Sequence, residues 1–208
     1  MMHPCFAMKN APFLLLPVLS ALTAFAHGAD LYQNVKITPQ RQISMRFYDV
    51  SAESGAGLKQ QLLSKAPEVA PGHRAIGKAV YQLSWHLDAS QQPDKCQLFG
   101  VEVTTKVELV MPNWLQLATM SAENQMSWNG FLSAMQEYEG RHKSIVQIAA
   151  KEIGDGVASL PVNSSCQVLR TQADAIGYQT LEAARERALR YQSETGKGRL
   201  MGVSYPHL

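Results

Sequence analysis

Cysteine is scarce in this chain of 208 residues, and its copies lie far apart. The three cysteines are Cys5, Cys96 and Cys166, so the close cysteine pairs typical of zinc ribbons and redox centres are absent. Charged residues make up only 17% of the chain and form no basic cluster, so we expect neither nucleic acid nor an anionic membrane as a partner. The G-x-S-x-G motif of serine hydrolases does not occur either.

The first residues differ in character from the rest of the chain. Met8-Lys9-Asn10 precedes an apolar run from Ala11 to Phe25, and Ala24-Phe25-Ala26 has the small-x-small form of a signal-peptidase site. We therefore expect residues 1–26 to be a cleaved secretory signal and the protein to be periplasmic or secreted. A transmembrane anchor is the alternative, but the apolar run is short and contains two prolines.

The chain after the signal carries 18 basic and 17 acidic residues and keeps Cys96 and Cys166. Two cysteines in an exported protein most often form one disulfide. Here it would close a loop of about 70 residues and contribute roughly 4 kcal/mol in the loop-entropy model. Two free thiols or a metal-binding pair are the alternative. We assign residues 27–198 to one secreted domain and residues 199–208 to a flexible tail.

The pattern of apolar residues changes from alternating to helical along the chain. Alternation predicts three strands, of which the last two pair as an antiparallel hairpin, and a period near 3.6 predicts helices. The predicted elements are strand 42–50, helix 54–65, strands 78–87 and 98–110, and two long helices, 123–153 and one that follows a Ser164-x-x-Gln167 capping box and ends near 193. We therefore expect an α+β domain with a small antiparallel sheet in its N-terminal half followed by two long packed helices.

The first long helix carries an ionisable pair on its apolar face. Between residues 126 and 154 the apolar residues recur at alternating steps of four and three, and the two positions that complete this stripe are Glu139 and His142. A buried carboxylate and a buried imidazole cost free energy unless they are paired or hold a metal. We therefore place the candidate site at this pair; a buried Glu–His hydrogen bond without further function is the alternative.

Around the pair the sequence reads Tyr138-Glu139-Gly140-Arg141-His142. In the H-E-x-x-H helix of zinc peptidases, two histidines four residues apart bind the metal and the glutamate activates a bound water. Glu139 and His142 stand in register with the glutamate and the second histidine, while Tyr138 occupies the first ligand position. A Glu-x-x-His pair alone also occurs by chance in many helices.

Several separate segments resemble a bacterial family of predicted secreted zinc-dependent proteases, a domain-of-unknown-function family with an H-E-x-x-H-type helix. The segments are 47–50 (FYDV), 82–85 (QLSW), Cys96 with its alternating strand, 109–114 (LVMPNW), 128–132 (WNGFL), 138–142 (YEGRH) and 191–198 (YQSETGKG). The resemblance covers residues 42–198 and implies a zincin-like active-site helix.

Carried over position by position, the resemblance implies that His142 is a zinc ligand and Glu139 the catalytic acid/base. Tyr138 replaces the first ligand, and Lys197 replaces the histidine of the family's late T-x-H-G segment. Zinc peptidases need three protein ligands and one open position, so these changes argue against zinc here. We infer instead that Lys197 approaches Glu139 as its counter-charge, with Tyr138 in the same network.

We therefore predict a non-catalytic pseudo-protease that binds a peptide or protein partner instead of cutting it, with no stable membrane span after signal cleavage. Zinc is implied by the resemblance but expected to be absent from this member. The alternative is an active zinc peptidase with rearranged ligands, namely Tyr138, His142 and His86, and with Glu139 as general base. His86 lies on the polar face of strand 78–87 and would have to reach the helix.

Overall fold

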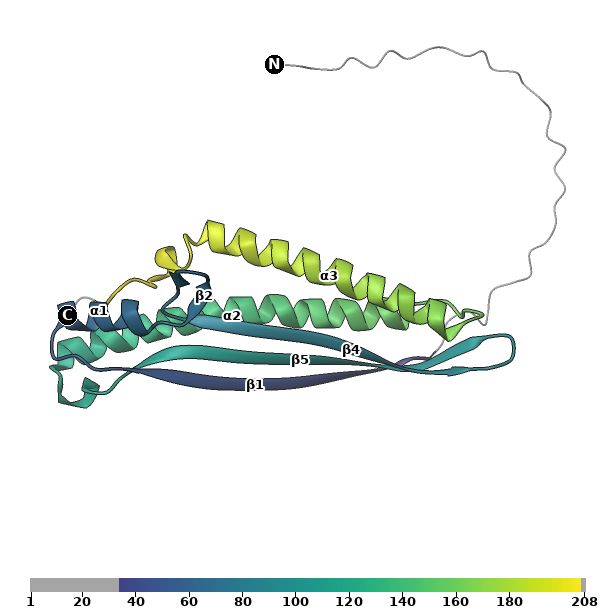
Figure 1. Cartoon of the computed structure of the whole chain (residues 1–208), viewed down its shortest axis with the longest axis horizontal. Helices are drawn as coiled ribbons and strands as arrows, with labels where there is room; N and C mark the ends of the chain where they lie inside the picture. Colours follow the sequence, from purple (N-terminus) through teal and green to yellow (C-terminus); the bar gives the residue numbers. More distant parts are fainter. Residues whose placement is uncertain (1–33, 207–208) are drawn as a thin grey trace, which may run out of the picture.

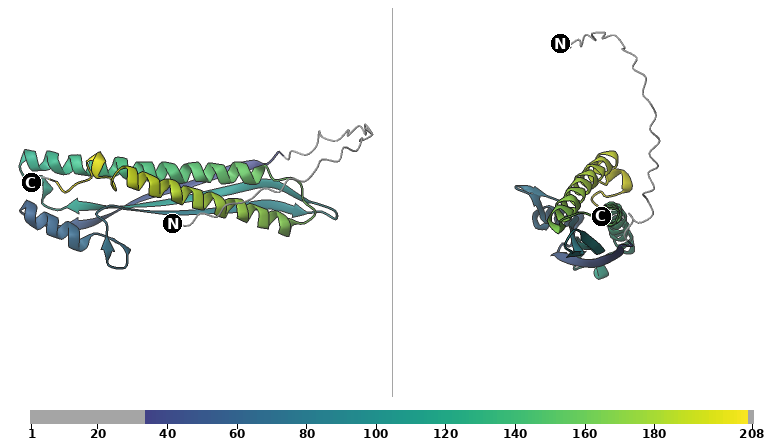
Figure 2. Two further views of the ribbon diagram at one scale, coloured as in Figure 1. Left: turned by 90° about the horizontal axis from the view of Figure 1, so that it is seen from above. Right: turned by 90° about the vertical axis from the view of Figure 1, so that its right-hand side faces the viewer.

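Residues 34–206 are described in a computed structural model, and the predicted signal, residues 1–26, lies outside them. Two long helices lie along one face of a long, narrow sheet, which makes the domain elongated (Figures 1 and 2). The elements in chain order are β1 (Lys36–Val50), α1 (Gly55–Lys65), β2 (Glu68–Ala70), β3 (His73–Arg74), β4 (Lys78–Gln91), β5 (Cys96–Trp114), η1 (Leu117–Thr119), α2 (Ala122–Ala158), α3 (Cys166–Glu194) and η2 (Arg199–Met201). The predicted α+β order, a sheet first and two long helices after it, is confirmed.

The main sheet has the strand order β1-β5-β4, with the longest strand in the centre. β4 and β5 form the predicted antiparallel hairpin, in which Tyr81 pairs with Val107. β1 pairs with the other edge of β5 in parallel, with Ile43 opposite Val107, so the sheet is mixed and not wholly antiparallel as expected. The reason lies in the connection: α1, β2, β3 and β4 intervene between β1 and β5, and this long crossover brings the chain back in its original direction.

Serine side chains begin the helices. Ser54 accepts from the backbone N–H of Gly57 at the start of α1, and Ser121 caps α2 in the same way. At α3 the cap is Ser165, whose Oγ accepts from the N–H of Gln167, one residue later than the predicted capping box. Of the described helices, none has an apolar stretch long enough to cross a bilayer.

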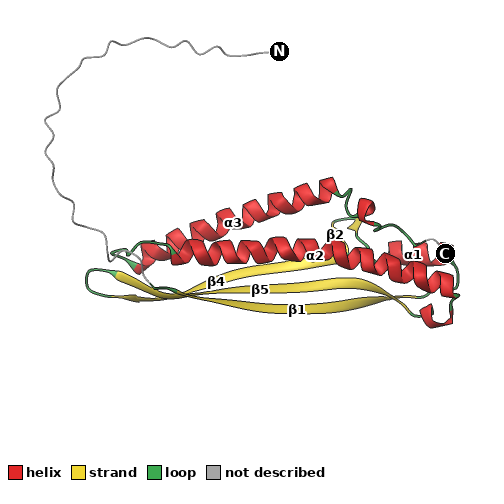
Figure 3. Cartoon of the chain, turned by 180° about the vertical axis from the view of Figure 1, so that it is seen from behind, coloured by secondary structure: helices red, strands yellow, loops and turns green. Residues whose placement is uncertain are grey.

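The two long helices run antiparallel and diverge from each other along α3 (Figures 1 and 3). α2 continues five residues beyond the predicted end, because Gly154 and Gly156 lie against neighbouring elements instead of ending the helix. A Cβ at Gly154 would lie 2.9 Å from Ile37 of β1, a distance that real Cβ atoms do not show. Glycine therefore lets α2 approach the sheet at this point.

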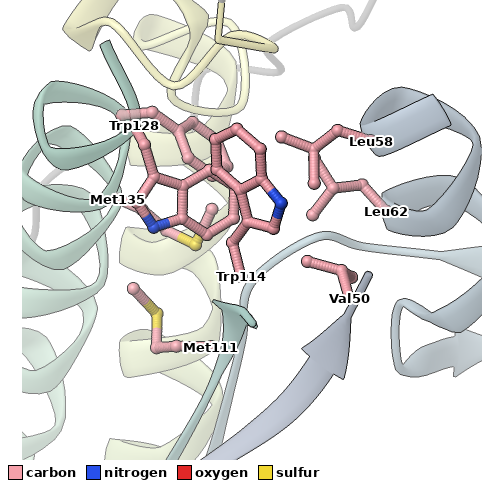
Figure 4. Packing of buried hydrophobic residues seen from close by; sticks show 8 residues of the cluster. Val50, Leu58, Leu62, Met111, Trp114, Trp128 and Met135 are labelled. Atoms are coloured by element: carbon pink, nitrogen blue, oxygen red, sulfur yellow. The ribbon is translucent and has the colours of Figure 1, made fainter. Parts of the chain in front are cut away.

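One end of the domain is held by an aromatic cluster. Trp114 and Trp128 meet edge to face with ring centroids 5.6 Å apart, and Leu58 and Leu62 point at them from α1 (Figure 4). The buried members are Val50, Leu58, Leu62, Met111, Trp114, Trp128, Phe131 and Met135. Burial of each large apolar side chain contributes about 1.5–3 kcal/mol, so this cluster fixes α1 and the start of α2 against the sheet.

The other end is held by what we call the disulfide cluster. Its buried members are Cys96, Leu98, Val101, Val103, Ile153, Val157, Leu169 and Ala173. The predicted disulfide between Cys96 and Cys166 is present, with Cα atoms 5.0 Å apart. It ties the first residue of β5 to the first residue of α3 across 70 positions of sequence.

The chain keeps making contacts beyond residue 198, where the predicted domain ends and the predicted flexible tail begins. Residues 199–201 form η2, and Val203 and Tyr205 pack against the aromatic cluster. The ammonium group of Lys59 lies 5.2 Å from the centroid of the Tyr205 ring. Up to residue 206 this segment is therefore a packed part of the domain.

Candidate functional site

The centre of α2 carries the ionisable pair between the two clusters. The buried apolar side chains of α2 before position 136 belong to the aromatic cluster, and those of Ile153 and Val157 belong to the disulfide cluster. Between them, Glu139 and His142 are both only 6% exposed. The spacing of apolar residues along the sequence of α2 therefore correctly predicted that these two side chains lie on the buried face of the helix.

Neither side chain has a polar partner within the described part of the chain. The carboxylate of Glu139 and the ring nitrogens of His142 form no hydrogen bond or ion pair, so the alternative of a buried Glu–His hydrogen bond is not realised. Among the described residues, the polar side-chain atoms that are completely buried and lack a partner belong to Gln61, Gln172 and Arg187. The polar side-chain atoms of Glu139 and His142 therefore keep a small accessible surface. Two buried, unpartnered ionisable groups destabilise the fold unless something binds them.

Aromatic rings from three elements surround the pair. The Tyr138 ring stacks on Tyr191 of α3 at 5.4 Å, and both rings meet His142 edge-on, at 5.0 and 5.1 Å between centroids. From β4, the hydroxyl of Tyr81 donates to the backbone carbonyl of Glu139 at 3.4 Å. The rings cover much of the pair, and electrostatic effects are stronger among buried groups than in open water.

This burial shifts the protonation of both ionisable groups. Burial raises the pKa of the Glu139 carboxyl to about 7. Burial lowers the pKa of His142 below its usual value, so the imidazole is neutral at pH 7. Burial, and then the nearby Glu139 charge, raise the pKa of Tyr138 to about 12. All three shifts favour the uncharged forms, so the site tends toward neutrality at neutral pH.

The structure does not bring Lys197 to Glu139, which corrects the predicted ion pair. Lys197 is exposed, in the turn between α3 and η2, with a left-handed φ of 59°. Its side chain lines an open groove of about 560 Å³ beside Leu189 and Arg199. No ion pair of residues 34–206 includes either Lys197 or Glu139. The turn after α3 holds the lysine at the surface, and Glu139 keeps no counter-charge from it.

The late segment nevertheless reaches the site through its glycine. Gly198 has φ 87°, and a Cβ placed there would lie 3.2 Å from the ring of Tyr138. Thr195 supports this turn by accepting from the N–H of Gly198 through its Oγ1 at 3.3 Å. The T-G-K-G stretch therefore packs beside Tyr138, while its lysine is exposed to solvent.

His86 lies on the wrong face of the sheet for the rearranged zinc set. Side chains alternate along β4, so that Tyr81 and Leu83 face the helices and are partly buried. His86 has the opposite parity and is exposed. The set of Tyr138, His142 and His86 is therefore not assembled.

The donor set at the site does not fit zinc. A zinc peptidase needs three protein ligands, usually histidine or carboxylate. Residues 34–206 contain no group of three or more His, Cys, Asp or Glu side chains placed to hold one ion. His142 has Tyr138 and Tyr191 as neighbours, and a phenol with a raised pKa gives up its proton less readily to become a ligand.

Two site residues were not assigned from the sequence, Tyr81 and Tyr191. Both lie on faces that the sequence pattern marks as inward, Tyr81 on its strand and Tyr191 on the second helix. The predicted inward orientation of these two side chains did not assign them to the site, because the sequence pattern of one strand or helix does not say which other element it packs against. A cavity lined by His142 and Tyr81 also lies here, between β4, α2 and α3.

Comparison with known proteins identifies a family over most of the chain. Residues 45–198 match a bacterial family of proteins of unknown function, DUF922. No curated protein and no solved structure matches the chain. The match lies within residues 42–198, the range of the resemblance noted from the sequence, and the family's description names no protease activity.

Proposed function

The chain belongs to the bacterial family of unknown function DUF922, and we propose that it is an exported, non-catalytic pseudo-protease that binds a ligand at the former catalytic position of α2. Its partner is a peptide or protein, or a small molecule with the chemistry of a peptide side chain. The observation that carries this proposal is the buried, unpartnered pair of Glu139 and His142.

The donor set supports the loss of catalysis. Of the three ligand positions that the resemblance implies, only the one at His142 carries a histidine; Tyr138 is a buried phenol and Lys197 an exposed cation. Glu139 has the position of a general base, but a base of this class acts on a metal-bound water. Without a complete ligand set, the carboxylate has no activated water to deprotonate.

The presence of a buried pair without polar partners supports a binding role. An apolar residue of similar size at either position would remove the desolvation cost of an unpartnered ionisable group. The polar atoms of this pair lie in largely buried residues but keep a small accessible surface, so a ligand can form hydrogen bonds with them. Export is supported by the signal-like first residues and by the disulfide, which persists in oxidising compartments.

Zinc content tests the proposal directly. The mature protein, beginning after residue 26, is purified without added zinc and subjected to elemental analysis, with Glu139→Gln as a matched control. We expect far less than one zinc per chain in both proteins and no cleavage of unfolded casein by either.

A double variant, Tyr138→His with Lys197→His, shows whether these two positions account for the missing metal. The turn after α3 holds position 197 at the surface, away from Glu139, so we expect the zinc content to stay well below one per chain, as in the wild type. A wild-type protein with one zinc per chain and casein cleavage that Glu139→Gln abolishes would overturn the proposal in favour of an active peptidase.

A further inference from the structure

The cavity beside the candidate site has a volume of about 190 Å³, lies between three elements and is partly open to solvent. His142 of α2 and Tyr81 of β4 form part of its wall, and the exposed Arg185 of α3 lines its rim. The rest of the wall is mainly aliphatic and includes Leu83, Ile145, Val146, Ala149, Leu181 and Ala188. A cavity with such walls favours an apolar guest.

One buried polar group on this wall is left without a partner. His142 is 6% exposed, and its ring nitrogens make no hydrogen bond to any described residue. The other polar groups are already engaged: the hydroxyl of Tyr81 donates to the carbonyl of Glu139, and Arg185 lies 3.7 Å from Glu182 at the surface. A guest that offers one hydrogen-bonding group to His142 therefore satisfies what the fold leaves open.

The size and polarity of the cavity define the guest. An apolar protein cavity of about 150 Å³ takes up benzene, so about 190 Å³ accommodates one six-membered aromatic ring with a small substituent. A charged guest would lose its hydration against aliphatic walls. A neutral imidazole has one N–H donor and one acceptor nitrogen, and a hydroxyl group can pair with either.

We propose that this cavity binds a phenol ring whose hydroxyl group hydrogen-bonds to His142. The inference deepens the proposed binding function and rests on it, because it assigns His142 to a ligand and not to a metal. The phenol can be a free small molecule or the tyrosine side chain of a peptide, which share the same ring and hydroxyl.

Calorimetric titration of the mature protein with p-cresol and with toluene tests the hydroxyl. The two probes have nearly the same shape, and only p-cresol can pair with His142. We expect p-cresol to bind about tenfold more tightly than toluene, the effect of one buried hydrogen bond. In His142→Phe we expect toluene to bind still and the preference for p-cresol to disappear.

A cavity-filling variant with a matched control keeps the test decisive if His142→Phe does not fold. Ala188→Leu places extra carbon atoms into the cavity, whereas Ala183→Leu makes the same change at an exposed position of α3. We expect Ala188→Leu to abolish binding of both probes and Ala183→Leu to leave it unchanged.

Three results would overturn the inference: no binding of p-cresol, equal affinity for toluene and p-cresol, or p-cresol binding that survives Ala188→Leu. Displacement of p-cresol by the tripeptide Gly-Tyr-Gly would identify a tyrosine side chain as the ligand, and its absence a free phenol. Zinc analysis reads a different quantity, so failure of the cavity proposal is distinguishable from failure of the pseudo-protease proposal.

Discussion

The two ends of this domain and the stretch of α2 between them differ in how well their buried groups are satisfied. The aromatic cluster and the disulfide cluster are built from apolar side chains in close contact, and the second is cross-linked by Cys96–Cys166. Between them the same helix buries Glu139 and His142 without a polar partner and borders a cavity. Well-packed ends allow the middle to hold groups that would not stay buried in a weaker fold, which is how many binding sites are supported.

The largest expected effect separates the disulfide end from the rest. Cys96→Ala with Cys166→Ala removes the cross-link over 70 residues and should lower the free energy of unfolding by about 4 kcal/mol. Urea denaturation of the variant and of the wild type under oxidising conditions measures the difference. A loss below about 1 kcal/mol would mean that side-chain packing alone stabilises this end of the domain. The disulfide would then not distinguish this end from the centre of α2.

Glu139→Gln measures the free-energy cost of the buried Glu139 carboxylate through the pH dependence of stability. The carboxyl has a raised pKa of about 7 in the fold, so the folded state holds a proton that the unfolded chain releases near pH 4.5. Stability of the wild type therefore falls as pH rises through this window, by up to about 3 kcal/mol. Glutamine does not titrate. The free energy of unfolding of the variant, relative to that of the wild type, should therefore increase by that amount between pH 4.5 and pH 8.

His142 acts with the opposite sign and does not obscure this measurement. Its pKa is lowered by burial, so stability rises with pH as the unfolded imidazole loses its proton near pH 6.5. This contribution is present in both proteins and cancels in the difference between them. A stability difference that stays constant from pH 4.5 to pH 8 would contradict the burial of an unpartnered carboxyl.

The smallest effects come from two glycines that differ only in their surroundings. A Cβ at Gly177 of α3 would lie 2.2 Å from the ring of Trp85, whose Nε1 donates to Asp174. Gly177→Ala should therefore displace this ring and cost about 1–3 kcal/mol. Thermal and urea unfolding measure the loss.

Gly130 of α2 is the matched control, because a Cβ there meets nothing within 4 Å. Gly130→Ala should stabilise the protein by about 0.5–1 kcal/mol through the reduced freedom of the unfolded chain. Equal effects of the two alanine substitutions would show that the contact between Trp85 and α3 is not tight.

Local patterns predicted the elements and part of the site. Alternation identified the hairpin of β4 and β5, and the stripe of α2 placed Glu139 and His142 on its buried face. These predictions hold because side-chain direction follows from backbone geometry within one element. The disulfide was predictable for a different reason, since the sequence after the expected signal contains two cysteines and therefore allows a single pairing.

Relations between elements were not predictable in the same way. The parallel pairing of β1 depends on where the chain returns after four intervening elements. Lys197 was expected at Glu139 because the resemblance assigns a ligand to its position in sequence, but the left-handed turn after α3 leaves it at the surface. The position of Lys197 in the motif correctly indicated that its segment lies near α2, but the local backbone conformation determines where the lysine side chain points.

By itself, the sequence determined the three main strands, the three α-helices, the burial of Glu139 and His142 and the incomplete match to the H-E-x-x-H pattern, because each of these follows from residue types and their spacing along the chain. Only the tertiary structure decided that Tyr81, Tyr138 and Tyr191 converge on this pair and that a cavity opens beside His142. These features depend on how β4, α2 and α3 pack together, and packing is set by contacts between residues that are distant in sequence.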